Sequence, residues 1–221
     1  MSLVEQASNR IAVKIASILN VNDDEKDIIC YGAFCTLQTI LSLFWIVLFG
    51  TIFHVLPQSL LVVCTIAALR KYSGGQHATA PSRCMIITTF ISTSFGLVIK
   101  NIFVNFNIAL IVSIGVLCFI ISFCLVFKFA PADTGSKPIS DKNMIYRLKK
   151  NSILIVCGLV IIDTLLMTFY FKYYNTMLLD LAVCIYMGVI WQSFTLTPIG
   201  YKTLYGVDLL MKNMYSRQIN T

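Results

Sequence analysis

The sequence predicts an all-α membrane protein that forms a single membrane domain over residues 1–221. Hydrophobic residues make up 57% of the chain and charged residues only 12%, about half the charged share of a soluble domain. The mean hydropathy is +0.81. Formal charges are concentrated in polar stretches between long apolar segments. These apolar segments are long enough to form helices of about 20 residues, the length that crosses a bilayer.

The first 27 residues predict an amphipathic helix that lies in the membrane interface. Apolar side chains recur at helical spacing at Ala7, Ile11 and Ile15, whereas Arg10 and Lys14 fall on other faces. Such a segment is too charged to cross the membrane and is typical of a helix lying on its surface. The acidic run at 23–27 is expected to be a solvated link.

Residues 28–197 predict about six transmembrane helices. The charge-free stretch from Ile28 to Leu69 is too long for one helix, and His54 and Pro57 mark the expected turn within it. The expected spans are 28–53, 55–69, 85–99, 106–127, 153–171 and 176–197. Two polar loops, 70–84 and 128–152, separate some of these spans. The tail 198–221 is polar and compatible with a surface helix.

The positive charges predict the orientation. Of the 17 lysines and arginines, only Lys100 and Lys172 fall in the connections expected on one side of the membrane. The others lie in the N-terminal segment, the loops 70–84 and 128–152, or the tail. Because connections rich in lysine and arginine stay in the cytoplasm, we expect both termini and both loops to be cytoplasmic.

The loop 70–84, which reads RKYSGGQHATAPSRC, contains the candidate catalytic pair. His77 precedes Cys84 by seven residues, and an imidazole beside a thiol can support nucleophilic acyl chemistry. Pro81 disfavours helix before it, so the chain can turn between the two residues. A helix that begins at Pro81 or is capped by Ser82 puts Cys84 in its first turn. The helix N-terminus, Arg83 and a protonated His77 would each favour the thiolate.

The glycines of this loop, and the cysteines and the histidine outside it, have other expected roles. Gly74 and Gly75 allow close backbone approach and could present N–H groups to an oxyanion. The seven other cysteines lie in apolar segments and are expected to be buried small hydrophobic residues. Zinc normally needs three or four ligands, and His54 belongs to the opposite side of the membrane from His77. No metal, other cofactor or nucleic acid is therefore expected.

Two other classes of protein remain open on composition alone. In a transporter, Asp163, Gln38 and Gln192 would line the pathway, and acidic residues within spans often have such roles. No symmetry between the halves of the chain supports this class. In a non-catalytic adaptor, the basic loop 128–152 would bind anionic lipid or a partner.

Two motifs resemble those of a known family. The first is Arg70-x-x-Ser73-Gly74-Gly75-x-His77-Ala78, followed by Cys84. The second is Ala130-Pro131-Ala132-Asp133-Thr134, followed by Lys137-Pro138-Ile139. In this order, and with the N-terminal segment, six spans and basic loop, the chain resembles the accessory gene regulator B family of bacterial membrane peptidases over essentially its whole length.

The resemblance implies a multi-pass cysteine endopeptidase of the bacterial cell membrane. It implies that Cys84 is the nucleophile and His77 its general base. The substrate would be the precursor of a quorum-sensing peptide, cut at the cytoplasmic face and cyclised to a thiolactone or lactone. The expected partners are this precursor, membrane lipid and a second copy in a homodimer. Asp133 is a candidate orienting group, and the candidate substrate or oxyanion contacts are Arg70, Ser73, Gly74, Gly75, Arg147, Lys149 and Lys150.

Overall fold

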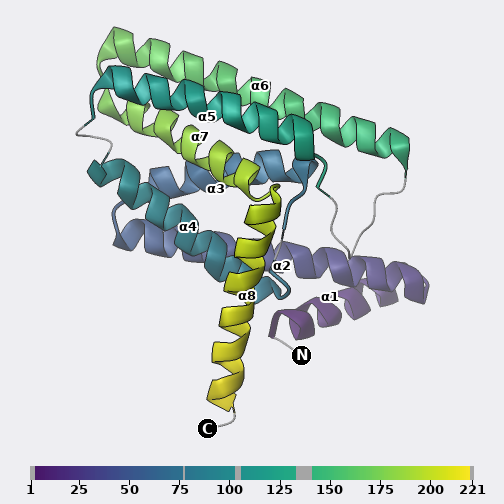
Figure 1. Cartoon of the computed structure of the whole chain (residues 1–221). Coiled ribbons are helices and arrows are strands. Elements are labelled where there is room, and N and C mark those ends of the chain that lie inside the picture. The colour runs from purple at the N-terminus through teal and green to yellow at the C-terminus, as the bar shows by residue number, and fades with distance from the viewer. Residues whose placement is uncertain (1–2, 77, 103–105, 133–140, 220–221) are drawn as a thin grey trace.

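The computed structural model describes residues 3–76, 78–102, 106–132 and 141–219. Within these ranges the regular structure is entirely helical (Figure 1). The helices are α1 (Leu3–Leu19), α2 (Asp23–Ile52), α3 (Leu56–Ser73), α4 (Pro81–Ile102), α5 (Ile108–Phe129), α6 (Lys142–Tyr173), α7 (Thr176–Phe194) and α8 (Pro198–Ile219). The predicted all-α class is confirmed.

Five of these helices, α2, α4, α5, α6 and α7, are long and apolar enough to cross a membrane. The protein is therefore a multi-pass membrane protein. The sixth expected span, 55–69, falls in α3, whose 18 residues end with Arg70 and Lys71 and include several polar side chains. This helix packs between α2, α4, α6 and α7 (Figure 1). Because neighbouring helices cover much of it, α3 can be less apolar than a lipid-facing span.

Two helices begin earlier than the charge pattern predicts. The acidic run expected to be a link forms the first turn of α2, where Asn22 and Glu25 make a reciprocal capping box. Carboxylates are favourable at this positive end of a helix. Likewise, α6 starts inside the expected loop 128–152, because the Asp141 side chain accepts a hydrogen bond from the Asn143 N–H at 2.9 Å.

The core is organised around α7, which is buried over much of its length. Its residues Ala182, Val183, Cys184 and Tyr186 form one cluster with Val62 and Ile66 of α3 and Ile111 of α5. A Cβ at Gly188 would lie 2.7 Å from the Thr65 Cβ. Helices in membranes associate through such close contacts of small residues, so α3 and α7 are held in a fixed register.

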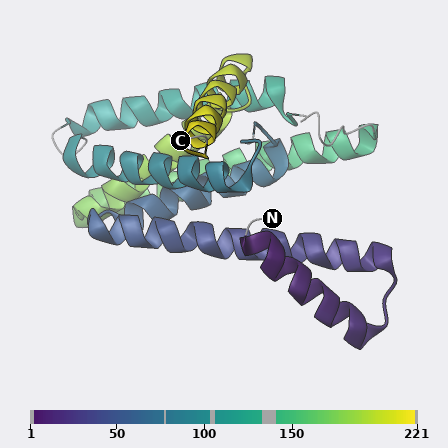
Figure 2. The same cartoon turned by 90° about the horizontal axis from the view of Figure 1, so that it is seen from below.

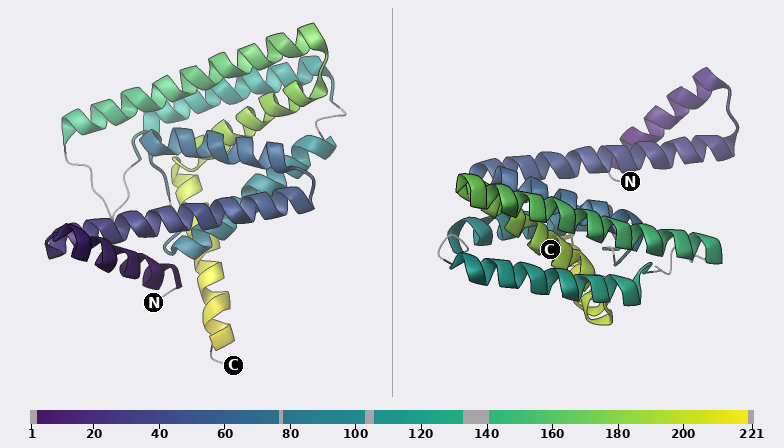
Figure 3. Two further views of the ribbon diagram at one scale, coloured as in Figure 1. Left: turned by 180° about the vertical axis from the view of Figure 1, so that it is seen from behind. Right: turned by 90° about the horizontal axis from the view of Figure 1, so that it is seen from above.

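The first helix lies along α2 at one edge of the molecule (Figures 2 and 3). It faces α2 through Ser8 and Ala12, which are buried. Two residues of its expected apolar face, Ile11 and Ile18, remain exposed. An exposed apolar stripe on a charged helix suits the interface of a bilayer, which is the placement we propose for α1.

The connections α2–α3 and α6–α7 lie at one end of the bundle, together with the end of α4 and the start of α5 (Figure 1). The segments 74–76, 78–80 and 130–132 lie away from that end. The tail predicted to be polar forms α8, which extends from the bundle while its first half lies beside the start of α4 (Figures 1 and 3). This arrangement surrounds the segments 74–76 and 78–80 with α3, α4, α7 and α8.

Candidate functional site

Cys84 lies in the first turn of α4, as the sequence predicts. The helix begins at Pro81, and the Cys84 N–H donates to the Ala80 carbonyl oxygen at 3.1 Å. The half-buried thiol lines a cavity of about 30 Å³. The cavity is bounded by residues of α3, α4, α7, α8 and the loop before α4 and includes Arg70, Gln76, Trp191 and Leu204. This volume is enough for about one water molecule.

Arg70 is the cationic group of this cavity. It ends the apolar part of α3, and its guanidinium donates to the Gln76 carbonyl oxygen, while its Nε is buried without an acceptor among the described residues. Burial lowers the pKa of Arg70, and negative charge on Cys84 or Tyr201 would raise it. Arg70 and Cys84 line the same cavity, and the role of Arg70 as a substrate or oxyanion contact stays a prediction.

The glycine pair shapes the backbone beside the cavity. Gly74 and Gly75 have φ values of 71° and 120°, a region that side chains strongly disfavour. The Ala132 N–H donates to the Ser73 carbonyl oxygen at 2.8 Å, and a Cβ at Gly74 would overlap the Ala132 carbonyl oxygen. The fold therefore brings the two sequence motifs, separated by some 50 residues, into direct backbone contact.

Gln192 of α7 fixes the same turn from the other side. Its fully buried side chain donates from Nε2 to the Gly74 carbonyl oxygen at 2.8 Å and to the Ser73 hydroxyl at 3.2 Å. The Thr195 hydroxyl donates to the Gln192 backbone carbonyl oxygen at 2.7 Å. The Ser73 side chain is fully buried and already bonded, so these contacts indicate a role in holding the turn. From the sequence, Gln192 was proposed only as a residue that would line a transport pathway.

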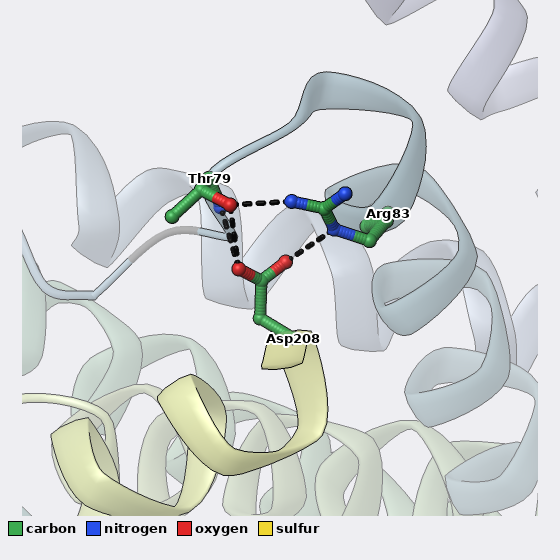
Figure 4. Close-up of polar contacts among 3 residues, drawn as sticks. All are labelled: Thr79, Arg83 and Asp208. Atoms are coloured by element: carbon green, nitrogen blue, oxygen red, sulfur yellow. Dashed lines mark hydrogen bonds and ion pairs between the residues drawn. The ribbon is translucent and has the colours of Figure 1, made fainter. Parts of the chain in front are cut away.

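Asp208 of α8 is a site-adjacent residue that the sequence analysis missed. The carboxylate accepts from Arg83 Nε at 2.6 Å, from the Thr79 hydroxyl at 2.7 Å and from the Thr79 N–H at 3.2 Å (Figure 4). Burial raises the pKa of Asp208, but the hydrogen bonds from Arg83 and Thr79 together lower it by more. The pKa therefore lies below its ordinary 3.8. The ion pair is therefore complete at neutral pH and is lost only as the pH falls below that value.

Arg83 is therefore paired with Asp208 in an ion pair. From the sequence, the charge of Arg83 was one of three influences predicted to favour a thiolate at Cys84. In the structure a carboxylate lies against this guanidinium, which offsets its field at the neighbouring thiol. Among the described residues that line the cavity, Arg70 is the remaining cation.

The basic cluster Arg147, Lys149 and Lys150 lies in the first turns of α6, apart from the start of α4 in the views of Figures 1 and 2. It is not part of the cavity around Cys84. The Lys149 ammonium lies 4.5 Å from the centre of the Phe127 ring. His77 and Asp133, with the motif residues 134–139, lie outside the described residues.

The remaining cysteines and the buried acid Asp163 are separate from this cavity. All eight cysteines are described and none is in a disulfide. Of the seven in apolar segments only Cys184 is buried; Cys35, Cys64, Cys124 and Cys157 are exposed. The expectation of burial was wrong for these four, because the outward faces of apolar helices meet lipid rather than protein. Asp163 interacts with the Tyr186 hydroxyl inside the bundle.

We expect Gly74→Ala to disrupt the contact between the two motifs. An alanine there has an unfavourable φ and overlaps the Ala132 carbonyl group, so the free energy of unfolding should fall by about 1–3 kcal/mol. Thermal unfolding in detergent measures this change. The control is Gly158→Ala in α6, where nothing lies within 4 Å of the added Cβ and helix propensity gains up to about 1 kcal/mol. Equal effects of the two substitutions would contradict the packing argument.

Comparison with known proteins places the chain in a family. Residues 8–196 match the accessory gene regulator B (AgrB) family. Two AgrB-like proteins from strains of Clostridium perfringens are 35% and 34% identical over 207 residues, which is 93% of this chain and 97% of each relative. The accessory gene regulator protein B of Staphylococcus intermedius is 30% identical over 66% of this chain and 68% of its own length. No solved structure matches. The chain belongs to the accessory gene regulator B family.

Proposed function

We propose that this protein is a membrane cysteine endopeptidase that processes a quorum-sensing peptide precursor. The observation that carries the proposal is the placement of Cys84. The thiol lies at a helix N-terminus, lines a cavity with Arg70, and is next to the point where the two family motifs meet through Gly74 and Ala132. Helix N-termini and nearby cations both favour thiolate formation.

The proposed first step is acyl transfer to Cys84. His77 takes the thiol proton, and the sulfur attacks the carbonyl carbon of the scissile peptide bond. A C–S bond forms, the carbonyl π electrons move to oxygen, and Arg70 stabilises the resulting oxyanion with its N–H groups. When the C–N bond breaks, His77 returns the proton to the departing amine. The products are a Cys84 thioester of the N-terminal fragment and a free C-terminal fragment.

The second step closes the ring. A thiol or hydroxyl within the bound fragment attacks the thioester, its proton passes to the Cys84 sulfur through His77, and a thiolactone or lactone is released. An internal nucleophile can have an effective molarity of about 10⁵ M or more, so cyclisation competes with hydrolysis.

The residues that suggest a transporter make contacts between helices, although Gln192 Oε1 and Asp163 Oδ1 have no hydrogen-bond partner among the described residues. Gln192 is bonded to Ser73 and Gly74, and the Gln38 side chain donates to the Pro81 carbonyl oxygen at 3.1 Å. Asp163 interacts with Tyr186. These contacts connect helices within the bundle, so they favour the peptidase over a transport pathway.

Incubating the purified protein in lipid vesicles with a candidate precursor, and reading the products by mass, tests the function. We expect two fragments whose masses add to that of the precursor when the N-terminal one is cyclised. A precursor that remains intact while the protein is folded and correctly inserted would argue for the non-catalytic adaptor instead.

We propose that the site and both termini face the cytoplasm, as the positive charges predict. In intact cells, a membrane-impermeant thiol reagent should then miss Cys84 and label a cysteine introduced by Asn101→Cys, an exposed position near the end of α4. Replacing the other seven cysteines removes background labelling. Labelling of Cys84 from outside would reverse the proposed topology.

We further propose that Arg147, Lys149 and Lys150 capture an acidic segment of the precursor. The competing explanation is attraction to anionic lipid, worth about 1 kcal/mol per residue. Replacing the three residues with glutamate should raise the KM for the precursor by about tenfold. Reversing the acidic residues of the precursor should restore the KM; no restoration would support lipid anchoring.

A further inference from the structure

The carboxylate of Asp208 is buried although much of α8 is exposed. Its exposed fraction is 3%, whereas Tyr205, Leu209 and Leu210 nearby are 55%, 43% and 65% exposed. The side chain points from the middle of α8 toward the segment before α4 (Figure 4). Residues 197–221 lie beyond the part of the chain that matches the family. The match to the family therefore does not include Asp208.

The partners of Asp208 lie on both sides of Pro81. Thr79, two residues after His77, donates to Oδ2 through its N–H and its hydroxyl at 3.2 and 2.7 Å. Arg83, immediately before Cys84, donates to Oδ1 at 2.6 Å and also donates to the Thr79 hydroxyl. One carboxylate therefore ties together the two ends of the turn that separates the candidate base from the candidate nucleophile.

Anchoring of α8 does not account for this arrangement. Leu204, one turn earlier on the same helix, is buried and lines the Cys84 cavity, so an apolar contact already attaches α8 to the site. A buried ion pair usually adds little net stability over apolar side chains of similar size, because both charges lose hydration. Its distinguishing property is directional geometry, since each oxygen accepts from a defined donor.

We propose that Asp208 is a positioning residue, which sets the place and orientation of the Cys84 thiol by fixing Thr79 and Arg83 on either side of Pro81. This proposal rests on the proposed peptidase function. The carboxylate touches neither the thiol nor the substrate in the proposed mechanism. It acts by restraining the turn at Pro81, so that the first turn of α4 holds the thiol in one place at the cavity. A displacement of a catalytic group by about 1 Å can reduce the rate about a hundredfold.

The test uses full-length protein in lipid with Asp208→Asn, which keeps the shape but removes the charge and one acceptor. We expect kcat for the precursor to fall about tenfold or more, with KM unchanged because the peptide does not contact Asp208. The matched control is Lys212→Gln, which removes an exposed charge from the same helix and should leave both constants unchanged. An unchanged kcat in Asp208→Asn would overturn the proposal.

Thr79 provides the rescue experiment. Thr79→Val removes the hydroxyl and should lower kcat, whereas Thr79→Ser retains it and should restore most of the rate. If the carboxylate acts through Thr79, the double variant Asp208→Asn with Thr79→Val should lose less than the product of the single losses. Independent, multiplicative losses would overturn the coupling.

Hydrogen exchange separates this proposal from the proposed function. In Asp208→Asn, the Thr79 amide should lose protection while the amides of α8 keep theirs. If the wild-type protein does not cleave the precursor, the peptidase assignment fails, and exchange alone decides whether Asp208 restrains the turn. Unchanged protection at Thr79, or loss of protection along the whole of α8, would contradict the restraint.

Discussion

Cys84→Ala should abolish precursor cleavage while leaving membrane insertion and oligomer size intact. The thiol is the only nucleophile of the proposed mechanism, so its loss removes the acyl-transfer step entirely. The substitution removes only one sulfur atom from a half-buried position, and the hydrogen bond from the residue 84 N–H to Ala80 uses the backbone. His77→Ala should also eliminate detectable cleavage, since a general base contributes about 10²–10⁴-fold. Product formation is measured by mass after extended incubation.

The controls are two cysteines outside the cavity. Cys64 on α3 and Cys157 on α6 are both exposed, so Cys64→Ala and Cys157→Ala should retain nearly wild-type cleavage. Normal product from Cys84→Ala would refute the assignment of the nucleophile. Loss of cleavage in the two control variants would show that the assay responds to general disturbance of the helices.

The local features of the site could be predicted from the sequence because short-range chemistry determines them. Pro81 disfavours helix before it and is compatible with the first helical position, and the structure confirms that α4 starts there with Cys84 in its first turn. Gly74 and Gly75 indicated close backbone approach, and both adopt positive φ.

The contacts that support the turn could not be predicted. Gln192 is separated from Gly74 by 118 residues and Asp208 from Thr79 by 129, and no periodicity in one sequence reveals such pairs. A weak signal existed in each case. Gln192 is an amide in an otherwise apolar span, and Asp208 is the only acidic residue of α8. Polar groups of this kind need partners when they are buried.

The number of membrane spans was hard to predict for the same reason, because the sequence does not show which helices pack together. Hydropathy describes contact with lipid, and α3 is surrounded largely by other helices. Its polar residues Ser59 and Thr65 are buried in the bundle, so the sequence alone could not separate a central helix from a lipid-facing one. Whether α3 spans the membrane stays a prediction.

A covalent intermediate is the second large effect that we expect. If the substrate's own attacking residue is replaced by alanine, the second step cannot occur, and the thioester on Cys84 should accumulate. Hydrolysis of this thioester should be slow compared with normal cyclisation, because water lacks the high effective molarity of an internal nucleophile. With the unaltered precursor the same thioester should be transient, because the internal nucleophile is held close to it.

Intact-mass analysis of the protein after rapid quench with the alanine-substituted precursor tests the nucleophile directly. We predict an increase equal to the mass of the free N-terminal fragment minus one water molecule, with the modification located on Cys84 and released by hydroxylamine. Cys84→Ala should show no such increase. Cleavage of the altered precursor without any adduct, or an adduct on another residue, would contradict the assignment of Cys84 as the nucleophile.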